Sequence, residues 1–361
     1  MTRDLIISLD AMGGDHAPDI VIEGASIARE RVPNLRFLIF GDETRIVPLL
    51  TRYPILKDCC EVRHTDKKIS ADDRPSQALR RGRDSSMGQS IQAVKDGDAC
   101  AAVLAGNTGA QMALAKFILR TMPGIDRPAL AALLPTSRGE SVMLDLGANV
   151  ECDENNLVQF AIMGAAFART VLGVAKPKTA LLNVGVEELK GNDAIKNADK
   201  MLREANIPMD YIGFTEGHGL GGGEIDVVVT DGFTGNIALK TAEGTANMIA
   251  ALLKKALNES TMSKIGTLFA SSSLMALKNH LDPNNHNGAV FMGLNGLVIK
   301  SHGGASSKGF ASAIGVAIDM AENDLAGKIS RDLMNFNSTI ENEDSSSHDD
   351  KVIEMNVKEQ S

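Results

Sequence analysis

The segment "LDAMGGDHAP", Leu9–Pro18, places two aspartates, two glycines and a histidine between two regular elements. Ahead of it, "LIISL" is a short apolar run of strand-forming residues, and behind it Ile20, Gly24 and Ile27 keep helical spacing. Pro18 suits the first turn of that helix. The segment is therefore predicted to be a strand-to-helix turn. In an α/β sheet such turns lie at the carboxyl edge of the strands, where ligands bind and helix N-termini offer N–H groups to anions.

Further strand-like runs recur along the chain, and most of them precede a helical pattern. This alternation predicts an α/β fold with a mostly parallel sheet covered by helices on both faces. No linker rich in Pro, Gly or Ser divides the chain, so residues 1–334 are predicted to form a single α/β catalytic domain, followed by an acidic, disordered tail at residues 335–361. The predicted strands are Leu5–Leu9, Leu35–Phe40, Ala99–Leu104, Val142–Leu146, Thr179–Val184 and Ile225–Thr230.

Composition excludes several classes of protein. The 361 residues carry a formal net charge of -9, with no Trp and two Tyr, which argues against nucleic-acid binding. No apolar run has the length of a membrane span, and charges within the first ten residues do not fit a signal peptide, so neither segment is expected. The four cysteines form no CxxC pattern and are expected to be free thiols in a reducing compartment.

A long helical hairpin is predicted at about residues 234–288. Ile237, Met248, Ile249 and Leu252 belong to the apolar face of its first helix, and a second apolar helix follows after "NESTMSK". Packing into the core or against a second subunit is expected ahead of contact with a membrane surface.

Two strand ends repeat one pattern. "LAGNTGA" (Leu104–Ala110) and "TDGFTGN" (Thr230–Asn236) both run from a strand through x-G-x-T-G-x into a helix. Asn107 or Thr108, and Thr234, are predicted to be N-caps, and the glycines allow the backbone to approach a ligand. Together with the opening turn, they give three candidate anion-binding turns.

Three more strand ends carry polar groups. "LDLGANV" supplies Asp145 and Asn149, "LNVGVEELKG" supplies Lys190, and "IKSHGGASSKGF" brings His302 and Lys308 to a helix start. Any one of these residues is more often a surface charge or a cap than a catalytic group. Their recurrence at one edge of one predicted sheet indicates a large polar site.

A set of motifs resembles one family. "DAMGGDHAP", "AGNTGA", "GIDRPALA", "LDLGANV", "LVQFAIMG", "LLNVGVEELKG" and "DVVVTDGFTGN" occur in the order found in the bacterial phosphate acyltransferases of phospholipid synthesis, the PlsX family. The resemblance covers roughly Leu5 to Asp324. It implies transfer of a long-chain fatty acyl group from acyl carrier protein to inorganic phosphate, which yields acyl phosphate for a membrane glycerol-3-phosphate acyltransferase.

The resemblance also implies a fold like that of isocitrate and isopropylmalate dehydrogenases and of phosphotransacetylase. Members of the family are cytoplasmic homodimers, and peripheral attachment to the inner face of the cell membrane is a further expectation. No cofactor and no metal are expected. The region from Lys254 to Asn287 is the least family-like part of the chain, so membrane attachment through the hairpin rests on the least support.

The implied chemistry suits the residues already described. Phosphate is anionic at neutral pH and the leaving thiol has a pKa of about 8.5, so phosphate can attack the thioester directly, without a protein nucleophile or a strong base. His16, Lys190 and Asn236 are the expected catalytic residues: His16 as donor to the oxyanion or the leaving sulfur, Lys190 for the phosphate charge. The expected binding residues are Asp10, Gly13, Gly14, Asp15, Asn107, Thr108, Gly109, Asp231, Thr234, Gly235 and His302.

Acyl carrier protein is strongly acidic, so its docking requires a basic surface near the site. Arg80, Arg81 and Arg83 in "LRRGRDSSMG" form the densest basic cluster and are the expected docking residues, with a solvated helix end as the alternative.

Three rival functions are weighed against this one. The first is a phosphotransacetylase acting on a small acyl-coenzyme A, and the second is a metal- and NAD-dependent decarboxylating dehydrogenase, for which Asp145, Asp226 and Asp231 make no recognisable metal set. The third is a non-catalytic scaffold for acyl carrier protein or a membrane. "GHGLGG", Gly217–Gly222, matches the dinucleotide pattern G-x-G-x-x-G, but it precedes a strand instead of following one and is predicted to be a flexible loop.

Overall fold

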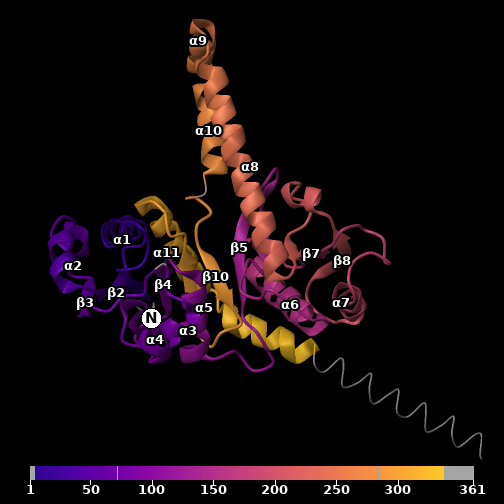
Figure 1. Cartoon of the computed structure of the whole chain (residues 1–361), viewed down its shortest axis with the longest axis horizontal. Helices are drawn as coiled ribbons and strands as arrows, with labels where there is room; N and C mark the ends of the chain where they lie inside the picture. The colour runs from indigo at the N-terminus through magenta and orange to yellow at the C-terminus, as the bar shows by residue number, and fades with distance from the viewer. Residues whose placement is uncertain (1–4, 71, 283, 337–361) are drawn as a thin grey trace, which may run out of the picture.

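One sheet organises residues 5–70, 72–282 and 284–336, the part of the chain that the computed structural model describes. Eleven strands in this part lie in the order β3-β2-β1-β4-β11-β10-β5-β6-β9-β7-β8, and a helical hairpin projects from the α/β body (Figure 1). The predicted α/β fold is confirmed. The strands are β1 (Leu5–Asp10), β2 (Leu35–Gly41), β3 (Cys60–His64), β4 (Ala101–Ala105), β5 (Ala129–Thr136), β6 (Gly139–Leu144), β7 (Lys178–Leu182), β8 (Asp210–Thr215), β9 (Val227–Val229), β10 (Ala289–Met292) and β11 (Leu297–Ser301).

The sheet changes direction in its middle. Pairing is parallel from β3 to β11 and from β6 to β8, but β11 with β10, β10 with β5, and β5 with β6 are antiparallel. Three reversals leave β6, β9, β7 and β8 running opposite to β1, β4 and β11. The expectation that all polar strand ends share one edge of one parallel sheet is therefore wrong, and the carboxyl ends fall into two groups.

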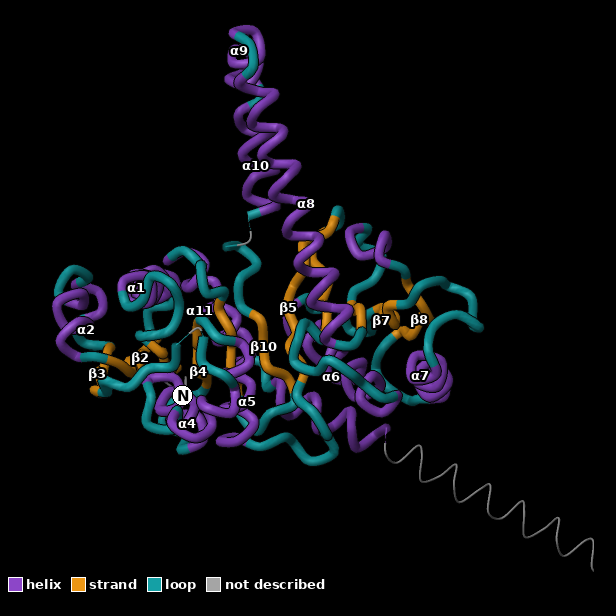
Figure 2. Tube along the Cα trace, in the orientation of Figure 1, coloured by secondary structure: helices purple, strands orange, loops and turns teal. Residues whose placement is uncertain are grey.

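Helices cover the sheet on both faces, as Figure 2 shows for the body. Along β4, Ala101 and Val103 pack into one apolar cluster while Ala102 and Leu104 pack into the other, because successive side chains of a strand point to opposite faces. The labelled helices are α1 (Asp19–Arg31), α2 (Glu43–Leu50), α3 (Pro75–Arg81), α4 (Ser86–Lys95), α5 (Thr108–Leu119), α6 (Glu154–Val171), α7 (Asp193–Glu204), α8 (Gly232–Asn258), α9 (Thr261–Phe269), α10 (Ser271–Leu281) and α11 (Ser307–Glu322), with short 3-10 turns at Pro54–Leu56 and Gly217–Gly221. Residues 325–336 are helical as well.

Side-chain caps fix where the helices near the strand ends begin. Asn107 accepts the N–H of Ala110 at the start of α5, and Ser306 accepts the N–H of Gly309 at the start of α11. Each cap satisfies one of the N–H groups that a first helical turn leaves without an intrahelical partner. The Asn107 alternative of the predicted cap is confirmed.

The predicted hairpin consists of α8, α9 and α10. It stands away from the body with α9 at its tip (Figure 1), and many of its apolar side chains are exposed, including Met248, Leu252, Leu268 and Phe269. The prediction that the hairpin packs into the core is therefore wrong for this part of α8 and for α9. Packing against a second subunit stays a prediction. No helix in the described part of the chain is long and apolar enough to cross a membrane. The predicted disordered tail lies outside the described residues, apart from residues 335 and 336. These two are helical and Phe336 is buried, so the prediction of disorder is wrong there.

Candidate active site

The loops that follow β1, β4 and β11 meet at one place. The N–H of Asp15 donates to the carbonyl oxygen of Gly303 at 2.9 Å. A Cβ on Gly13 would collide with the carbonyl oxygen of Ala105, so only glycine allows this close approach of two backbones. We call residues 10–16, 106–109 and 302–304 the first polar cluster. It brings together predicted site residues from three separate segments of the chain.

Asp10 holds the opening turn in place. It is buried, and its Oδ1 accepts the N–H of Met12 at 3.0 Å. Burial raises the pKa of this carboxyl, while hydrogen bonds from its surroundings, including the Met12 and Gly13 amides, oppose the rise. Asp10 therefore fixes the backbone of the turn.

The start of α5 supplies helix N–H groups to the first polar cluster. Asn107 caps Ala110, and its amide nitrogen donates to the carbonyl of Asp73 at 2.7 Å. The N–H groups of Thr108 and Gly109 come before the capped one and have no acceptor within the helix. They are suited to an anion or a developing oxyanion, whereas the side chain of Asn107 is engaged in fixing the loop.

Two histidines lie on the exposed side of this cluster. His16 is exposed at the end of the glycine turn. The Nδ1 of His302 accepts the N–H of Gly304 at 3.2 Å, which leaves the proton of the neutral ring on Nε2. Burial and then the neighbouring Lys300 lower the pKa of His302, so the ring is neutral at neutral pH and Nε2–H can donate. The geometry gives His302 a better-defined donor role than the sequence indicated.

A second polar cluster, residues 145–149 and 231–236, lies at the carboxyl ends of β6 and β9 and contains the predicted site residues Asp231, Thr234, Gly235 and Asn236. The buried carboxylate of Asp145 accepts the N–H groups of Leu130, Ala148 and Asn149 at 2.7–3.0 Å, so it ties β5 to the loop that follows β6. Burial raises its pKa against these hydrogen bonds. Asp145 therefore shapes the loop and has little capacity left for a ligand.

Asp231 begins α8. Its Oδ1 accepts the N–H of Thr234 at 2.8 Å, and its Oδ2 accepts the hydroxyl of Thr234 at 2.7 Å. The predicted cap Thr234 is thus wrong, because Asp231 is the N-cap. A Cβ on Gly235 would overlap the carbonyl oxygen of Asp145, so glycine is required there, and Asn236 next to it is exposed.

Helix α8 starts in the second cluster. Lys240, in its third turn, and Glu243, in its fourth, act electrostatically on Lys300 and His302 at the end of β11. From Asp231 to Lys240 the helix rises about 14 Å. Charges on α8 therefore act on the first cluster, although the two groups of strand ends share no sheet edge.

Lys190 lies apart from the first cluster. It is exposed in the loop after β7, where its carbonyl oxygen accepts a hydrogen bond from the side-chain amide of Asn183 at 3.1 Å.

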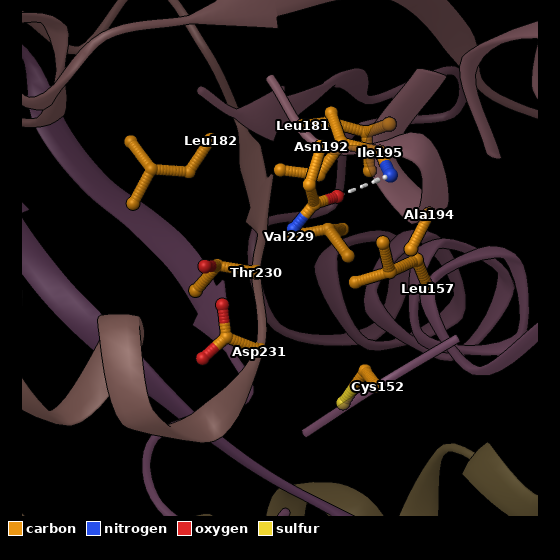
Figure 3. Close-up of a pocket in the computed structure, with 10 residues that line it drawn as sticks. All are labelled: Cys152, Leu157, Leu181, Leu182, Asn192, Ala194, Ile195, Val229, Thr230 and Asp231. Carbon is orange, nitrogen blue, oxygen red and sulfur yellow. Dashed lines mark hydrogen bonds between the residues drawn. The ribbon is translucent and has the colours of Figure 1, made fainter. Parts of the chain in front are cut away.

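A cavity of about 20 Å³ lies among Cys152, Leu182, Asn192 and Asp231 (Figure 3). That volume has room for one water-sized molecule, so the cavity cannot hold a long acyl chain in this form.

Cys152 borders the same cavity. Burial, together with the carboxylates of Asp145 and Asp231, raises the pKa of its thiol to about 12. Because the thiolate is the nucleophilic form, this cysteine is inert at neutral pH.

Comparison with known proteins identifies the family. The model of the family described as fatty acid synthesis protein matches residues 5–328. The chain belongs to this family. It is 58% identical over 334 residues to the phosphate acyltransferase of Parvibaculum lavamentivorans, with 92% of each chain covered. It is 52% identical over 332 residues to the phosphate acyltransferase of Paramagnetospirillum magneticum, covering 92% of this chain and 95% of the relative. The protein is therefore an enzyme, an acyltransferase of lipid biosynthesis.

Solved structures share the fold. A phosphotransacetylase from Streptococcus pyogenes superposes with a TM-score of 0.60 at 16% identity, over 89% of this chain and 95% of the other. A 4-hydroxythreonine-4-phosphate dehydrogenase from Klebsiella pneumoniae superposes with a TM-score of 0.51 at 14% identity, over 89% of this chain and 98% of the other. These similarities confirm the expected architecture, shared by phosphotransacetylases and dehydrogenases.

The sequence analysis did not single out Lys300 and Lys240, whose charges lower the pKa of His302 in addition to the effect of burial. Lys300 stands one residue before the end of β11, and Lys240 lies within a helix predicted only as amphipathic. The position of Lys300 two residues before His302 was the available signal.

Proposed function

We propose that the enzyme transfers a long-chain acyl group from acyl carrier protein to inorganic phosphate, by direct attack of phosphate on the thioester. One observation carries this proposal: the glycine turn after β1, the start of α5 and His302 converge on the first polar cluster. Such a cluster offers N–H donors to anionic oxygens. The function of the relatives named phosphate acyltransferase supports the same assignment.

The reaction balances without a covalent enzyme intermediate. An oxygen of hydrogen phosphate forms a bond to the thioester carbon, and the displaced electron pair collects on the carbonyl oxygen. The carbonyl then re-forms, the carbon–sulfur bond breaks, and the sulfur leaves with the electron pair and takes up the proton that phosphate loses. The enzyme has to hold the phosphate, stabilise the oxyanion and protect the leaving thiolate until it is protonated.

The residues divide into donors and organisers. The N–H groups of Thr108 and Gly109, with Nε2–H of His302, are the donors we assign to the reacting oxygens. His16, the donor expected from the sequence, stays a proposal for proton delivery to sulfur. Asp10 and Asp145 organise the loops from beneath.

The experiment is incubation with long-chain acyl carrier protein, with and without inorganic phosphate. We expect thiol release that depends on phosphate, and an acyl phosphate product that hydroxylamine converts to a hydroxamate. Short-chain acyl-coenzyme A is the parallel arm, because equal or better turnover there would favour the phosphotransacetylase alternative. Binding of acyl carrier protein without any release would refute catalysis on this substrate.

His16→Ala tests proton delivery. We expect loss of most turnover in a folded protein. A normal rate would remove His16 from the mechanism and leave His302 as the histidine of the reaction.

A basic surface supports docking of the acidic carrier protein. Helices α3 and α5 pack together and contain no carboxylate, while the exposed ring of Phe117 lies 5.2 Å from the guanidinium of Arg83 and 5.8 Å from that of Arg120. An apolar ring surrounded by cations is complementary to an acidic helix with apolar contacts. The exposed cations of this surface are Arg74, Arg80, Arg81, Arg83, Lys116 and Arg120.

Charge reversal separates docking from chemistry. Arg83→Glu should raise the KM for acyl carrier protein and leave use of acyl-coenzyme A unchanged. Arg52→Glu, an exposed reversal at the end of α2, is the matched control. An unchanged KM for the carrier in the Arg83 variant would contradict docking on this surface.

The hairpin supports the proposal of a homodimer. Its exposed apolar side chains, among them Met248, Ile249 and Leu252, need a partner in water. We propose that a second copy covers them, and that the dimer works at the cytoplasmic membrane surface, where a membrane glycerol-3-phosphate acyltransferase takes the product. Leu252→Glu should shift the mass in solution toward the monomer, and an unchanged mass would refute the assignment of this face.

A further inference from the structure

The segment that returns from the hairpin to the body, residues 284–287, holds the turn that carries His302. The Oδ1 of Asn287 accepts the backbone N–H of His302 at 2.9 Å. The Nδ2 of the same side chain donates to the hydroxyl of Ser301 and to the carbonyl oxygen of Gly309, both at 2.8 Å. These partners fix the orientation of the amide, because its oxygen can only accept and its nitrogen can only donate. Asn287 therefore joins the last residue of β11 to the first turn of α11.

The same segment holds the other end of the turn. The Oδ1 of Asn284 accepts the backbone N–H of Ser306 at 3.1 Å and the hydroxyl of Ser306 at 2.8 Å, at the residue that caps α11. A Cβ on Gly309 would lie 2.5 Å from this oxygen, so a larger residue there would displace it. Between the two anchored ends lie two glycines, residues 303–304, which do little to restrict the backbone. The course of the turn is therefore set by Asn284 and Asn287.

The segment is in turn attached to the end of α10. The side-chain amide of Asn285 donates to the carbonyl oxygen of Asn279 at 2.6 Å, and Nε2 of His286 lies 3.0 Å from the carbonyl oxygen of His280. Because the last carbonyls of a helix have no partner within it, these two side chains satisfy the end of α10. The Nδ1 of His286 lies 2.5 Å from the carboxylate of Glu140 in β6. Both partners of this ring are acceptors, so the imidazolium, with two N–H donors, satisfies both.

We propose that Asn287 is a positioning residue for His302, and that the hairpin, through the contacts of α10 with residues 284–287, fixes the direction in which the ring presents Nε2–H. The inference rests on the proposed function for the role of His302 as a donor to the reacting oxygens. The ring depends on the backbone of the turn, because its Nδ1 accepts the N–H of Gly304 within that turn at 3.2 Å. Loss of the Asn287 contacts releases the turn, and with it the bond that keeps the proton on Nε2.

The first test observes the ring directly, in the full chain and without any substrate. NMR of histidine labelled with nitrogen-15 reports which ring nitrogen carries the proton, and His302→Ala identifies the signal of His302. We expect the neutral Nε2–H form in the parent and a smaller share of it in Asn287→Ala. Asn285→Ala should change the signal in the same direction by a smaller amount, because it detaches the segment from α10.

The matched control is Asn258→Ala. This asparagine also donates to a helix carbonyl, that of Lys254 at 2.7 Å, but it lies at the end of α8 beside the hairpin tip (Figure 1). Its replacement should leave the His302 signal unchanged. An unchanged signal in a folded Asn287→Ala would overturn the proposal. If that variant does not fold, Asn285→Ala decides, and an unchanged His302 signal there would overturn the link to the hairpin.

The second test asks whether Asn287 acts through His302. Asn287→Ala should lower kcat about tenfold and leave both KM values within about twofold, since a misdirected donor loses transition-state stabilisation. In a His302→Ala background the same replacement should change kcat by less than about twofold, because the group that it positions is gone. Equal losses in both backgrounds would overturn the proposal. Since the NMR measurement needs no turnover, failure of acyl carrier protein as a substrate would leave its result intact.

Discussion

Replacing Asp231 by alanine should weaken the start of α8. The carboxylate accepts two hydrogen bonds from Thr234, one from the backbone at 2.8 Å and one from the hydroxyl at 2.7 Å. Loss of an N-cap costs about 0.5–2 kcal/mol. The hydroxyl of Thr234 is exposed and turns to water, so the second bond adds little. We therefore expect the free energy of unfolding to fall by about 1 kcal/mol, about a fivefold change in the folded-to-unfolded ratio.

The assay combines urea unfolding with steady-state kinetics. Asp231→Asn is the matched control, because asparagine caps a helix about as well as aspartate but carries no charge. Alanine should lower both the urea midpoint and kcat/KM, since α8 carries Asn236 and Lys240, whereas asparagine should preserve both. The reasoning would be refuted if Asp231→Asn kept its stability and lost its activity. The carboxylate would then act on the substrate directly.

Three further predictions concern single contacts. Glu140 lies 2.5 Å from Nδ1 of His286, and this hydrogen bond, opposed by burial, raises the pKa of the histidine. The stabilisation from this contact is therefore complete below the pKa of His286 in the unfolded state, about 6.5. It is lost as the pH rises through the higher pKa of the folded state. The melting temperature of the parent should fall over this pH range, and that of Glu140→Gln should not. Matching dependences of the two melting temperatures on pH would contradict this prediction. Cys152→Ser should keep kcat within about twofold, since the thiol is not ionised at neutral pH, and complete loss in a folded variant would point to a covalent step. Gly235→Ala should lower the unfolding free energy by about 1–3 kcal/mol, because its methyl group meets the carbonyl of Asp145, and an unchanged urea midpoint would disprove that collision.

Local patterns predicted strands β1, β2, β4, β6, β7 and β9. The apolar runs at β1 and β2 are followed by helices, and α5 begins at the predicted Asn107 cap. The patterns did not predict β3, β5, β8 and β10. β3 and β8 mix polar with apolar residues, and the middle of β5 is only partly buried, so none gives a clear period. β10 has only four residues, too few for periodicity to separate it from a turn.

Missing β5 and β10 caused the larger error, the assignment of all polar strand ends to one edge of the sheet. Strand direction depends on β5 and β10, which insert antiparallel pairings between the two parallel halves. Without them, every polar strand end is assigned to one edge, and Lys190 becomes a neighbour of His16. The sequence therefore supplied candidate site residues, yet it could not divide them into two clusters, because that division is a property of long-range pairing.

The same limit explains why Lys300 was not recognised. In the sequence it is one lysine at the end of an apolar run, where an exposed charge is the ordinary outcome. In the fold it is paired with Leu104 of β4 and Ala289 of β10 and lies two residues before His302, whose pKa burial and then Lys300 lower. Neither strand neighbour can be found from the local pattern, because both pairings join segments far apart in the sequence. Long-range strand pairing therefore determines which charges act on the first polar cluster.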